Sequence, residues 1–237
     1  MSAPVFLADD LSPDTVVLTG PEGRHAATVR RLRVGEAVDL CDGRGGRASS
    51  VVARVGRDEV ALDVVRRTTE APAAPRVVLV QALAKGDRGE LAVELATEVG
   101  VDEVVPWAAA RCVTKWEGER GEKARQRWAS TAREAGKQSR RAWLPVVSPL
   151  ASTRDVAARL AGSTGLVLHE EASVPLTSLD LRGVSEVVLV VGPEGGIAPE
   201  ELAVLGGTAV RLGASVLRTS TAGAAAIAVV SALTGRW

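Results

Sequence analysis

A turn with three glycines and one carboxylate, Gly192-Pro193-Glu194-Gly195-Gly196, follows the aliphatic run Val187 to Val191. The run predicts a strand buried on both faces, and the glycines allow positive φ and close approach to a ligand. The turn lacks the Gly-Lys-Ser/Thr and G-x-G-x-x-G patterns of phosphate sites, and Glu194 would repel a pyrophosphate. This chemistry favours a neutral or cationic ligand held by backbone groups. The alternative is a strand-to-helix turn that only packs, and this turn alone leaves both open.

A second stretch of the same kind favours the ligand site. It runs from a strand at Val210 through Gly213 to Arg218 and Thr219, before a helix predicted over Gly223 to Leu233. That helix consists almost wholly of small apolar residues, so it must be buried on most sides. Two turns at the carboxyl ends of sheet strands predict a ligand site at that edge.

The two histidines, His25 and His169, are far apart in the sequence. His169 ends a predicted strand at the same sheet edge, so it either borders the ligand or is an ordinary strand-end residue. With only Cys41 and Cys112 besides, we expect no metal site and no disulfide framework. Two solitary cysteines, no signal peptide and no membrane-length apolar run lead us to expect a soluble cytoplasmic protein.

The elements that must position these residues form two predicted domains, residues 1–70 and 71–237, divided at a proline- and alanine-rich linker over 68–75. The first predicts a small barrel with short strands at 16–18, 37–40, 50–53 and 60–65. Within it, residues 21–33 predict a helix that carries four arginines, either as a solvated face or as a phosphate-binding surface: Arg24, Arg30, Arg31 and Arg33.

In the second domain strands alternate with helices. We expect strands at 77–84, 103–107 and 165–169, and helices at 87–99 and 119–139. This alternation predicts an α/β domain with a mostly parallel sheet and helices on both faces.

Charge is distributed unevenly, although the net charge is zero and the pI of about 6.8 gives no global signature of nucleic-acid binding. Residues 111–145 hold ten Lys or Arg against four Glu, whereas residues 146–210 hold three against eight acids. Aromatic side chains among cations can stack on bases while the cations hold phosphates. For the three tryptophans of the basic segment, we favour a core role for Trp128 and leave Trp116 and Trp143 open.

The paired turns, G-P-E-G-G and the L-G-x-x-x-L-R-T-x-T-A of residues 212–222, resemble the SPOUT class of S-adenosylmethionine-dependent RNA methyltransferases. Within that class they resemble the RsmE-like family, which methylates N3 of a uridine in 16S ribosomal RNA. Further segments resemble this family at 25–31, 85–88, 97–101 and 138–145. Four residues depart from its pattern: Arg30, Leu95, Lys137 and Ser220. We therefore assign no catalytic role to Lys137 or Ser220.

The resemblance implies a PUA-like β-barrel domain that helps hold RNA, followed by a SPOUT domain with a deep trefoil knot. It also implies S-adenosylmethionine as cofactor, 16S ribosomal RNA or the small ribosomal subunit as substrate, and a homodimer. The predicted cofactor-binding residues are Leu168, His169, Gly192, Pro193, Glu194, Gly195, Gly196, Ile197, Leu212, Gly213, Val216, Leu217, Arg218, Thr221 and Ala222. The predicted RNA-binding residues are Arg24, His25, Arg30, Arg31, Arg33, Lys85, Arg88, Arg111, Gln138, Arg140 and Arg141.

Methyl transfer to a uracil nitrogen is an in-line displacement that depends on holding donor and acceptor in contact. Loss of the N3 proton leaves negative charge on O2 and O4, which a guanidinium can stabilise. Arg218 is the predicted catalytic residue. Its alternative role is to pair with Glu194 and brace the two turns.

Two other functions stay open. One is a SPOUT methyltransferase that acts on a ribose 2′-hydroxyl or on transfer RNA. The other is a non-catalytic RNA-binding assembly factor without affinity for adenosylmethionine, against which the two unaltered turns argue.

Overall fold

The computed structural model describes residues 3–237, which form two compact units. The first comprises residues 3–72 with Gly136–Leu144, and the second comprises Ala73–Ala135 with Pro145–Trp237. Residues 136–144 thus group in space with the first unit, although they follow the linker in sequence. The domain limits at residues 70 and 71 stay a prediction.

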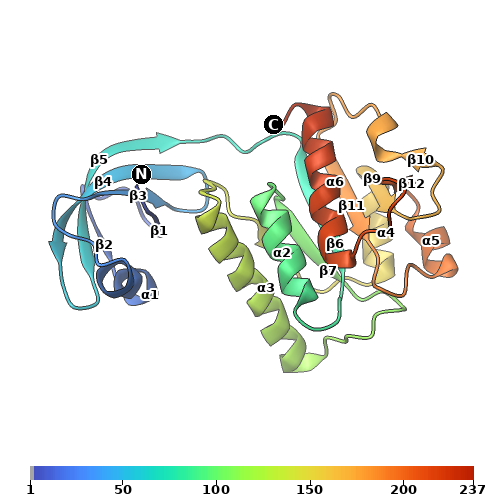
Figure 1. Cartoon of the computed structure of the whole chain (residues 1–237), viewed down its shortest axis with the longest axis horizontal. Helices are drawn as coiled ribbons and strands as arrows, with labels where there is room; N and C mark the ends of the chain where they lie inside the picture. The colour runs from blue at the N-terminus through green and yellow to red at the C-terminus, as the bar shows by residue number, and fades with distance from the viewer. Residues whose placement is uncertain (1–2) are drawn as a thin grey trace. The chain divides into compact units, whose positions relative to one another are not determined.

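The first unit is a curled five-stranded sheet with the order β1-β3-β4-β5-β2 (Figure 1). β1 pairs parallel with β3, and the other pairs are antiparallel. Register shifts within the pairing of β4 with β5 bend the sheet around one apolar core that includes Phe6, Leu40 and Leu62. The strands are β1 (Val5–Leu7), β2 (Thr15–Leu18), β3 (Ala37–Cys41), β4 (Gly46–Val55) and β5 (Val60–Thr69).

The helix predicted over residues 21–33 is shorter than expected. It consists of α1 (Gly20–Arg24) and a π-helical turn, η1 (His25–Val29). The chain leaves the helix because Arg31 adopts a left-handed φ of 53°. Of the four arginines, only Arg24 lies in the helix, and Arg30, Arg31 and Arg33 lie in the loop that follows.

The second unit is a seven-stranded sheet with the order β10-β12-β9-β11-β6-β7-β8. Every strand pair of this sheet is parallel, so the expected mostly parallel sheet is entirely parallel in the described residues. The trefoil knot stays a prediction. The strands are β6 (Arg76–Ala82), β7 (Glu103–Trp107), β8 (Val146–Val147), β9 (Thr164–Leu168), β10 (Val174–Pro175), β11 (Glu186–Val191) and β12 (Thr208–Arg211).

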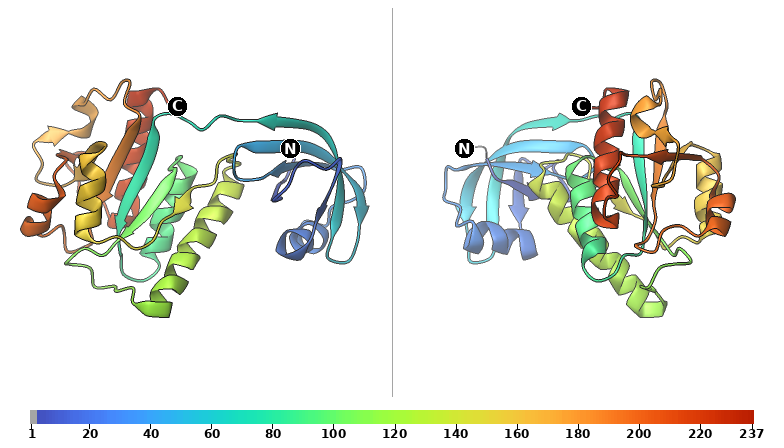
Figure 2. Two further views of the ribbon diagram at one scale, coloured as in Figure 1. Left: turned by 180° about the vertical axis from the view of Figure 1, so that it is seen from behind. Right: turned by 45° about the vertical axis from the view of Figure 1, so that its right-hand side comes forward.

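Helices cover both faces of this sheet (Figure 2). On β6, Val77 and Leu79 join the core under α2, α3 and α6, whereas Val78 and Val80 join the core under α4 and α5. A strand buried on both faces explains why the sequence shows continuous apolar runs rather than alternation. The helices are α2 (Arg88–Glu98), α3 (Gly118–Gln138), α4 (Thr153–Ala161), α5 (Pro199–Leu205) and α6 (Thr219–Thr234), with a short 3-10 turn η2 (Leu176–Ser178).

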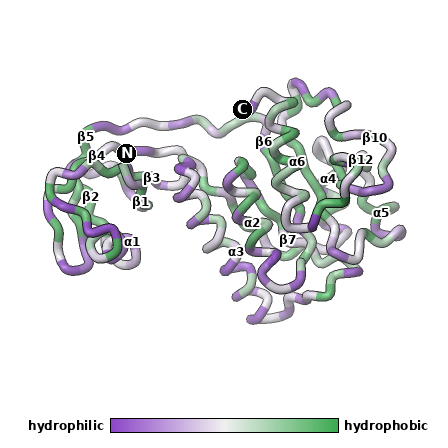
Figure 3. Tube along the Cα trace, in the orientation of Figure 1, coloured by the Kyte–Doolittle hydropathy of each residue, from purple (hydrophilic) through white to green (hydrophobic). Residues whose placement is uncertain are grey.

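Helix α6 begins at Thr219, earlier than the predicted start at Gly223. Its buried stripe packs on the sheet, and a Cβ at Gly223 would lie 2.9 Å from the Leu79 side chain. The missing side chain therefore lets the helix lie close to β6. Figure 3 shows the apolar and neutral character that this helix keeps along most of its length.

A buried carboxylate, Glu103 at the start of β7, binds side chains of several neighbouring segments at the amino-terminal edge of the sheet. Its oxygens accept hydrogen bonds from Arg159, with one N–O distance of 2.8 Å, and from Ser148 and Arg76. Burial raises the pKa of Glu103, but the hydrogen bonds from Arg159 and Ser148 and the charges of Arg159 and Arg76 outweigh it and hold the pKa below its ordinary value. The ionised form is therefore the one that stabilises the fold.

We expect Glu103→Gln to lower the free energy of unfolding by about 3 kcal/mol at pH 7, because it removes one partner of a buried ion pair. Since the folded pKa is lowered, this contribution is present above the unfolded pKa of about 4.3 and is lost as pH falls through the folded value. Urea unfolding at several pH values measures both effects. The control is Glu186→Gln, whose more exposed carboxylate also pairs with Arg76 and should cost below about 1 kcal/mol. If the two variants lost the same free energy of unfolding, the stabilising role given to the buried Glu103 carboxylate would be contradicted.

Candidate functional site

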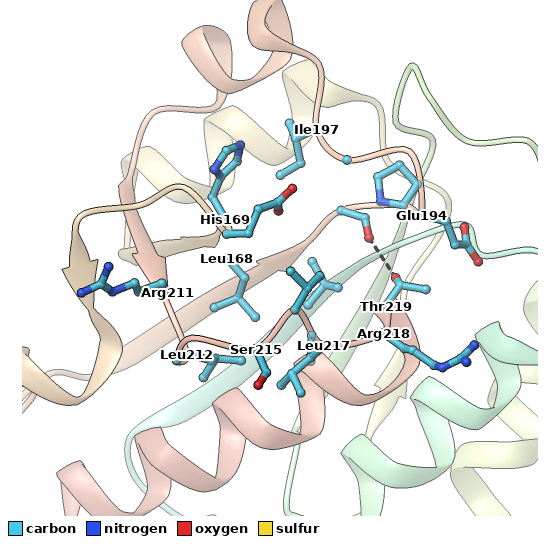
Figure 4. Close-up of a pocket in the computed structure, with 18 of the residues that line it drawn as sticks. Leu168, His169, Glu194, Ile197, Arg211, Leu212, Ser215, Leu217, Arg218 and Thr219 are labelled. Carbon is cyan, nitrogen blue, oxygen red and sulfur yellow. Dashed lines mark hydrogen bonds between the residues drawn. The ribbon is translucent and has the colours of Figure 1, made fainter.

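The two glycine-containing turns meet at the carboxyl edge of the parallel sheet around a cavity of about 390 Å³ (Figure 4). Its walls come from the end of β9, the turn after β11, the loop after β12 and the start of α6. This is the edge at which open α/β sheets bind ligands.

Of the fifteen residues predicted to bind a cofactor, all but Gly195 and Thr221 line this cavity. Arg88, predicted to bind RNA, lines it as well. The remaining lining residues belong to the same three segments but were not among the predicted cofactor-binding residues: Glu170, Val191, Val210, Arg211, Ala214, Ser215 and Thr219. Their position next to the glycine turns in the sequence is the signal that could have identified them as cavity residues.

The three glycines of the first turn serve different purposes. Only Gly196 has a positive φ, at 72°. Gly195 does not, so the expectation of positive φ there is wrong. A Cβ at Gly195 would instead lie 3.3 Å from the Arg111 Cβ, and one at Gly192 would lie 2.7 Å from the Ile197 Cγ1. Gly196 is thus required for its backbone, and the other two for space.

Thr219 connects the two turns. Its buried hydroxyl donates to the carbonyl oxygen of Gly192 over 2.8 Å, drawn as the dashed line in Figure 4, and accepts from Nε2 of Gln81 over 3.0 Å. Gln81 is fully buried on β6, so one side chain joins β6, the turn after β11 and the first turn of α6.

Glu194 does not pair with Arg218. Its Oε1 lies 3.5 Å from Nη1 of Arg88 and accepts the backbone N–H of Lys85 over 3.2 Å. The alternative role of Arg218 as a brace to Glu194 is therefore wrong. Arg218 is exposed at the cavity, and within residues 3–237 its guanidinium has no carboxylate within 4.0 Å.

His169 and Glu170 line the cavity beyond the end of β9. The backbone N–H of His169 donates to the carbonyl of Val210 over 2.9 Å, which extends the pairing of β9 with β12. The ring Nδ1 accepts the backbone N–H of Glu171 over 3.2 Å. His169 therefore lies beside the cavity, and a contact with the ligand stays a prediction.

The three predicted RNA-binding residues of the second unit lie around the G-P-E-G-G turn. Lys85 and Arg88 contact Glu194 as described, and Nη1 of Arg111 donates to the carbonyl of Gly195 over 3.0 Å. Lys85 and Arg111 are exposed. Three cationic side chains thus lie around this turn in a chain with no net charge.

The other predicted RNA-binding residues belong to the first unit: Arg24, His25, Arg30, Arg31, Arg33, Gln138, Arg140 and Arg141. Arg30, Arg31 and Arg33 are exposed, whereas Arg140 is half-buried and donates to the carbonyl of Ala3 over 2.7 Å. The basic segment of residues 111–145 is therefore divided between the two units.

The three tryptophans of the basic segment each contact other parts of the protein. Trp128 is buried in the core of the second unit, as expected, and Trp116 packs edge-on against it with 4.9 Å between ring centroids. Trp143 donates from Nε1 to the carbonyl of Glu70 over 2.8 Å in the first unit. Ser220, which departs from the family motif, is buried in the first turn of α6.

Across residues 3–237, no cluster of three or more His, Cys, Asp or Glu side chains is arranged to hold a metal ion. Over the same residues, no helix has the length and hydrophobicity needed to cross a membrane.

Both parts of the chain match family models of RNA methyltransferases. Residues 70–231 match an RNA methyltransferase domain, and residues 18–65 match an RNA methyltransferase PUA domain. The ribosomal RNA small subunit methyltransferase E of Mycobacterium bovis is 49% identical over 100% of this chain and 94% of its own length. The Bacillus subtilis protein of the same name is 31% identical over 92% of this chain and 90% of its own.

Solved structures agree with these matches. The ribosomal RNA small subunit methyltransferase E of Neisseria gonorrhoeae, bound to S-adenosyl methionine, is 28% identical with a TM-score of 0.89, covering 98% of each chain. A Legionella pneumophila protein in complex with the same cofactor is 26% identical with a TM-score of 0.90, covering 99% of each chain. The fold is that of a PUA-containing RNA methyltransferase. The chain belongs to the ribosomal RNA small subunit methyltransferase E family.

Proposed function

We propose that this protein transfers a methyl group from S-adenosylmethionine to N3 of a uridine in 16S ribosomal RNA, in the cytoplasm, where it meets the RNA or the small subunit. The observation that carries the proposal is the cavity built by two glycine turns at the carboxyl edge of the sheet. The adenosylmethionine in the relative from Neisseria gonorrhoeae, which shares the fold over nearly the whole chain, supports the choice of cofactor.

The residues present fit this cofactor. A volume of about 390 Å³ lies within the usual range of small-molecule sites. Leu168, Ile197 and Leu212 offer apolar contacts, and the backbone groups of the two turns offer hydrogen bonds. The cavity has no lysine placed as in a phosphate-binding loop, which favours an adenosine without a phosphate chain.

S-adenosylmethionine, when bound, supplies an electrophilic methyl group. The chain's own part is to hold a uracil ring beside it and to stabilise the charge that appears on O2 and O4 as N3 loses its proton. Arg218 suits this role because its exposed guanidinium lines the cavity without a carboxylate partner in the described chain. Arg88 suits it less, since Glu194 already pairs with it.

The first prediction of this proposal concerns the cofactor. Calorimetry should show binding of S-adenosylmethionine and S-adenosylhomocysteine, and no binding of ATP or NAD. Gly196→Ala should weaken S-adenosylmethionine binding about tenfold, because a left-handed φ costs a side chain roughly 1–2 kcal/mol and the turn would shift. Gly183→Ala is the matched control, since Gly183 has a φ of 74° but lies away from the cavity. Equal affinities in the two variants would rule out the turn as a cofactor site.

The second prediction concerns catalysis. Arg218→Ala should lower kcat about 100-fold, a larger effect than on adenosylmethionine affinity, because charge stabilisation is needed only in the transition state. Arg211→Ala, which removes another exposed arginine of the cavity, should change kcat little. Methyl incorporation into small-subunit RNA measures both. An Arg218→Ala enzyme with wild-type kcat would remove Arg218 from the mechanism.

The third prediction concerns RNA binding by the first unit. Replacing Arg30, Arg31 and Arg33 with Ala should weaken RNA binding and leave cofactor affinity unchanged. Each lost phosphate contact should lower the slope of log K against log salt by roughly 0.7 to 0.9. The melting temperature should stay nearly constant, since all three side chains are exposed. Wild-type affinity and slope would show that these arginines are only a solvated surface.

We also propose a two-fold homodimer. A stripe of small residues on α6 is left partly exposed, namely Thr221, Ala224, Ala225, Ala228 and Val229, and the nearby Val216 is 78% exposed. A second copy would cover such an apolar surface in the self-complementary way that two-fold symmetry requires. Light scattering at micromolar concentration should give twice the chain mass of 24.6 kDa. A monomer mass would contradict the proposal.

A further inference from the structure

The first unit contains a nearly buried ion pair that the proposed reaction does not use. Nζ of Lys137 lies 2.8 Å and 3.0 Å from the two carboxylate oxygens of Glu22, and both side chains are at least 85% buried. The backbone N–H of Leu7 donates to the same carboxylate over 3.1 Å. The Lys137 ammonium group and the Leu7 N–H therefore both hold the Glu22 carboxylate in place. Lys137 is also one of the positions where the sequence departs from the motif of its family.

The same ammonium group faces a histidine. Nζ of Lys137 lies 3.3 Å from Nδ1 of His25, and Phe6 holds the imidazole ring edge-on with 5.5 Å between ring centroids. Nζ also lies 5.3 Å from the centre of the Phe6 ring, which suits a cation–π contact. Phe6 and Lys137 therefore both contact the side chain of His25, and Glu22 holds the ammonium group of Lys137 in place.

This contact determines which ring nitrogen of His25 carries the proton. A lysine ammonium has three donors and no acceptor, so Nδ1 must offer its lone pair. An Nδ1–H group would point a donor at a donor, and a cationic ring would place two positive charges about 3 Å apart. The arrangement selects the neutral imidazole with its proton on Nε2.

Nε2 is left available to a ligand. Within residues 3–237 it has no hydrogen-bond partner, and it is not among the buried polar atoms that lack one, so it meets solvent. The chain after His25 leads within one turn to Arg30, whose backbone N–H donates to the His25 carbonyl over 2.8 Å. An RNA strand held by the arginines of this loop would pass beside an uncharged N–H donor.

We propose that Lys137 is a positioning residue, which holds His25 as the neutral Nε2–H form and so presents an uncharged donor to an acceptor oxygen of the RNA. The second half of this proposal rests on RNA binding by the first unit, whereas the first half does not. A phosphate oxygen and a base carbonyl are both suitable acceptors.

Nitrogen-15 NMR of the two imidazole rings tests the first half without RNA. At neutral pH, His25 should show a protonated Nε2 and an unprotonated Nδ1, and Lys137→Arg should preserve this pattern because Arg also donates. The double variant Glu22→Gln/Lys137→Met, which leaves no unpaired buried charge, should give a mixture of tautomers. His169, whose Nδ1 accepts from Glu171, is the internal reference and should not change.

Titration with small-subunit RNA at several salt concentrations tests the second half. His25→Ala should weaken binding about tenfold, as expected for one lost hydrogen bond, without changing the salt slope, because the ring is uncharged. The double variant should lose part of this affinity, and Lys137→Arg should keep it. A shallower salt slope in His25→Ala would mean a cationic ring and would overturn the proposal.

The outcomes separate the two ideas. An Nδ1–H or cationic His25 in the wild type, or an unchanged His25 pattern in the double variant, would overturn the positioning role of Lys137. The predicted tautomer combined with wild-type RNA affinity in His25→Ala would overturn the RNA contact alone. Failure of the wild-type protein to bind the RNA would instead reject the proposed substrate.

Discussion

The hydroxyl of Thr219 is the contact on which the site depends. It joins β6 through Gln81, the turn after β11 through the carbonyl of Gly192, and the first turn of α6, of which it is the first residue. A buried hydroxyl that both donates and accepts fixes its partners in direction as well as distance. Because both glycine turns are attached to it, their separation, and hence the cavity between them, is set by the interior of the sheet.

The rest of the second unit supports that contact. Each central strand is covered on both faces, so β6 and β11 are held by packing along their whole length and end at a defined point. The turns that follow can then be irregular, since the packed strands before them fix the point at which each turn begins. This explains how a loop as exposed as residues 213–218 can still form one wall of a cavity.

Much of the fold of the second unit could be predicted from the sequence, for physical reasons. The apolar runs of β6, β7 and β11 are long enough to show burial on both faces, and the predicted bounds of β7 agree with the structure. The shortest strands, β8 and β10, have two residues each and carry no periodicity. Helix α4 was missed although Ser152 and Asp155 form a capping box, a signal that sequence reading can use.

Contacts between distant residues were the part that the sequence could not provide. Nothing in the spacing of Arg88 and Glu194 predicts that they pair, and the G-P-E-G-G pattern does not tell which glycine has positive φ. The partner of Lys137 was equally hidden, because Glu22 lies 115 positions away. Such pairs are determined by the tertiary structure, and a local sequence pattern does not predict them.

The central claim is that this chain methylates N3 of a uridine in small-subunit RNA. Mass spectrometry of nucleosides from purified small-subunit RNA, compared between a parent strain and one that lacks this gene, tests it most directly. We expect 3-methyluridine to disappear in the deletion strain and to return with the wild-type gene, while the other methylated nucleosides stay constant. Unchanged 3-methyluridine, or loss of a ribose-methylated nucleoside in its place, would contradict the account.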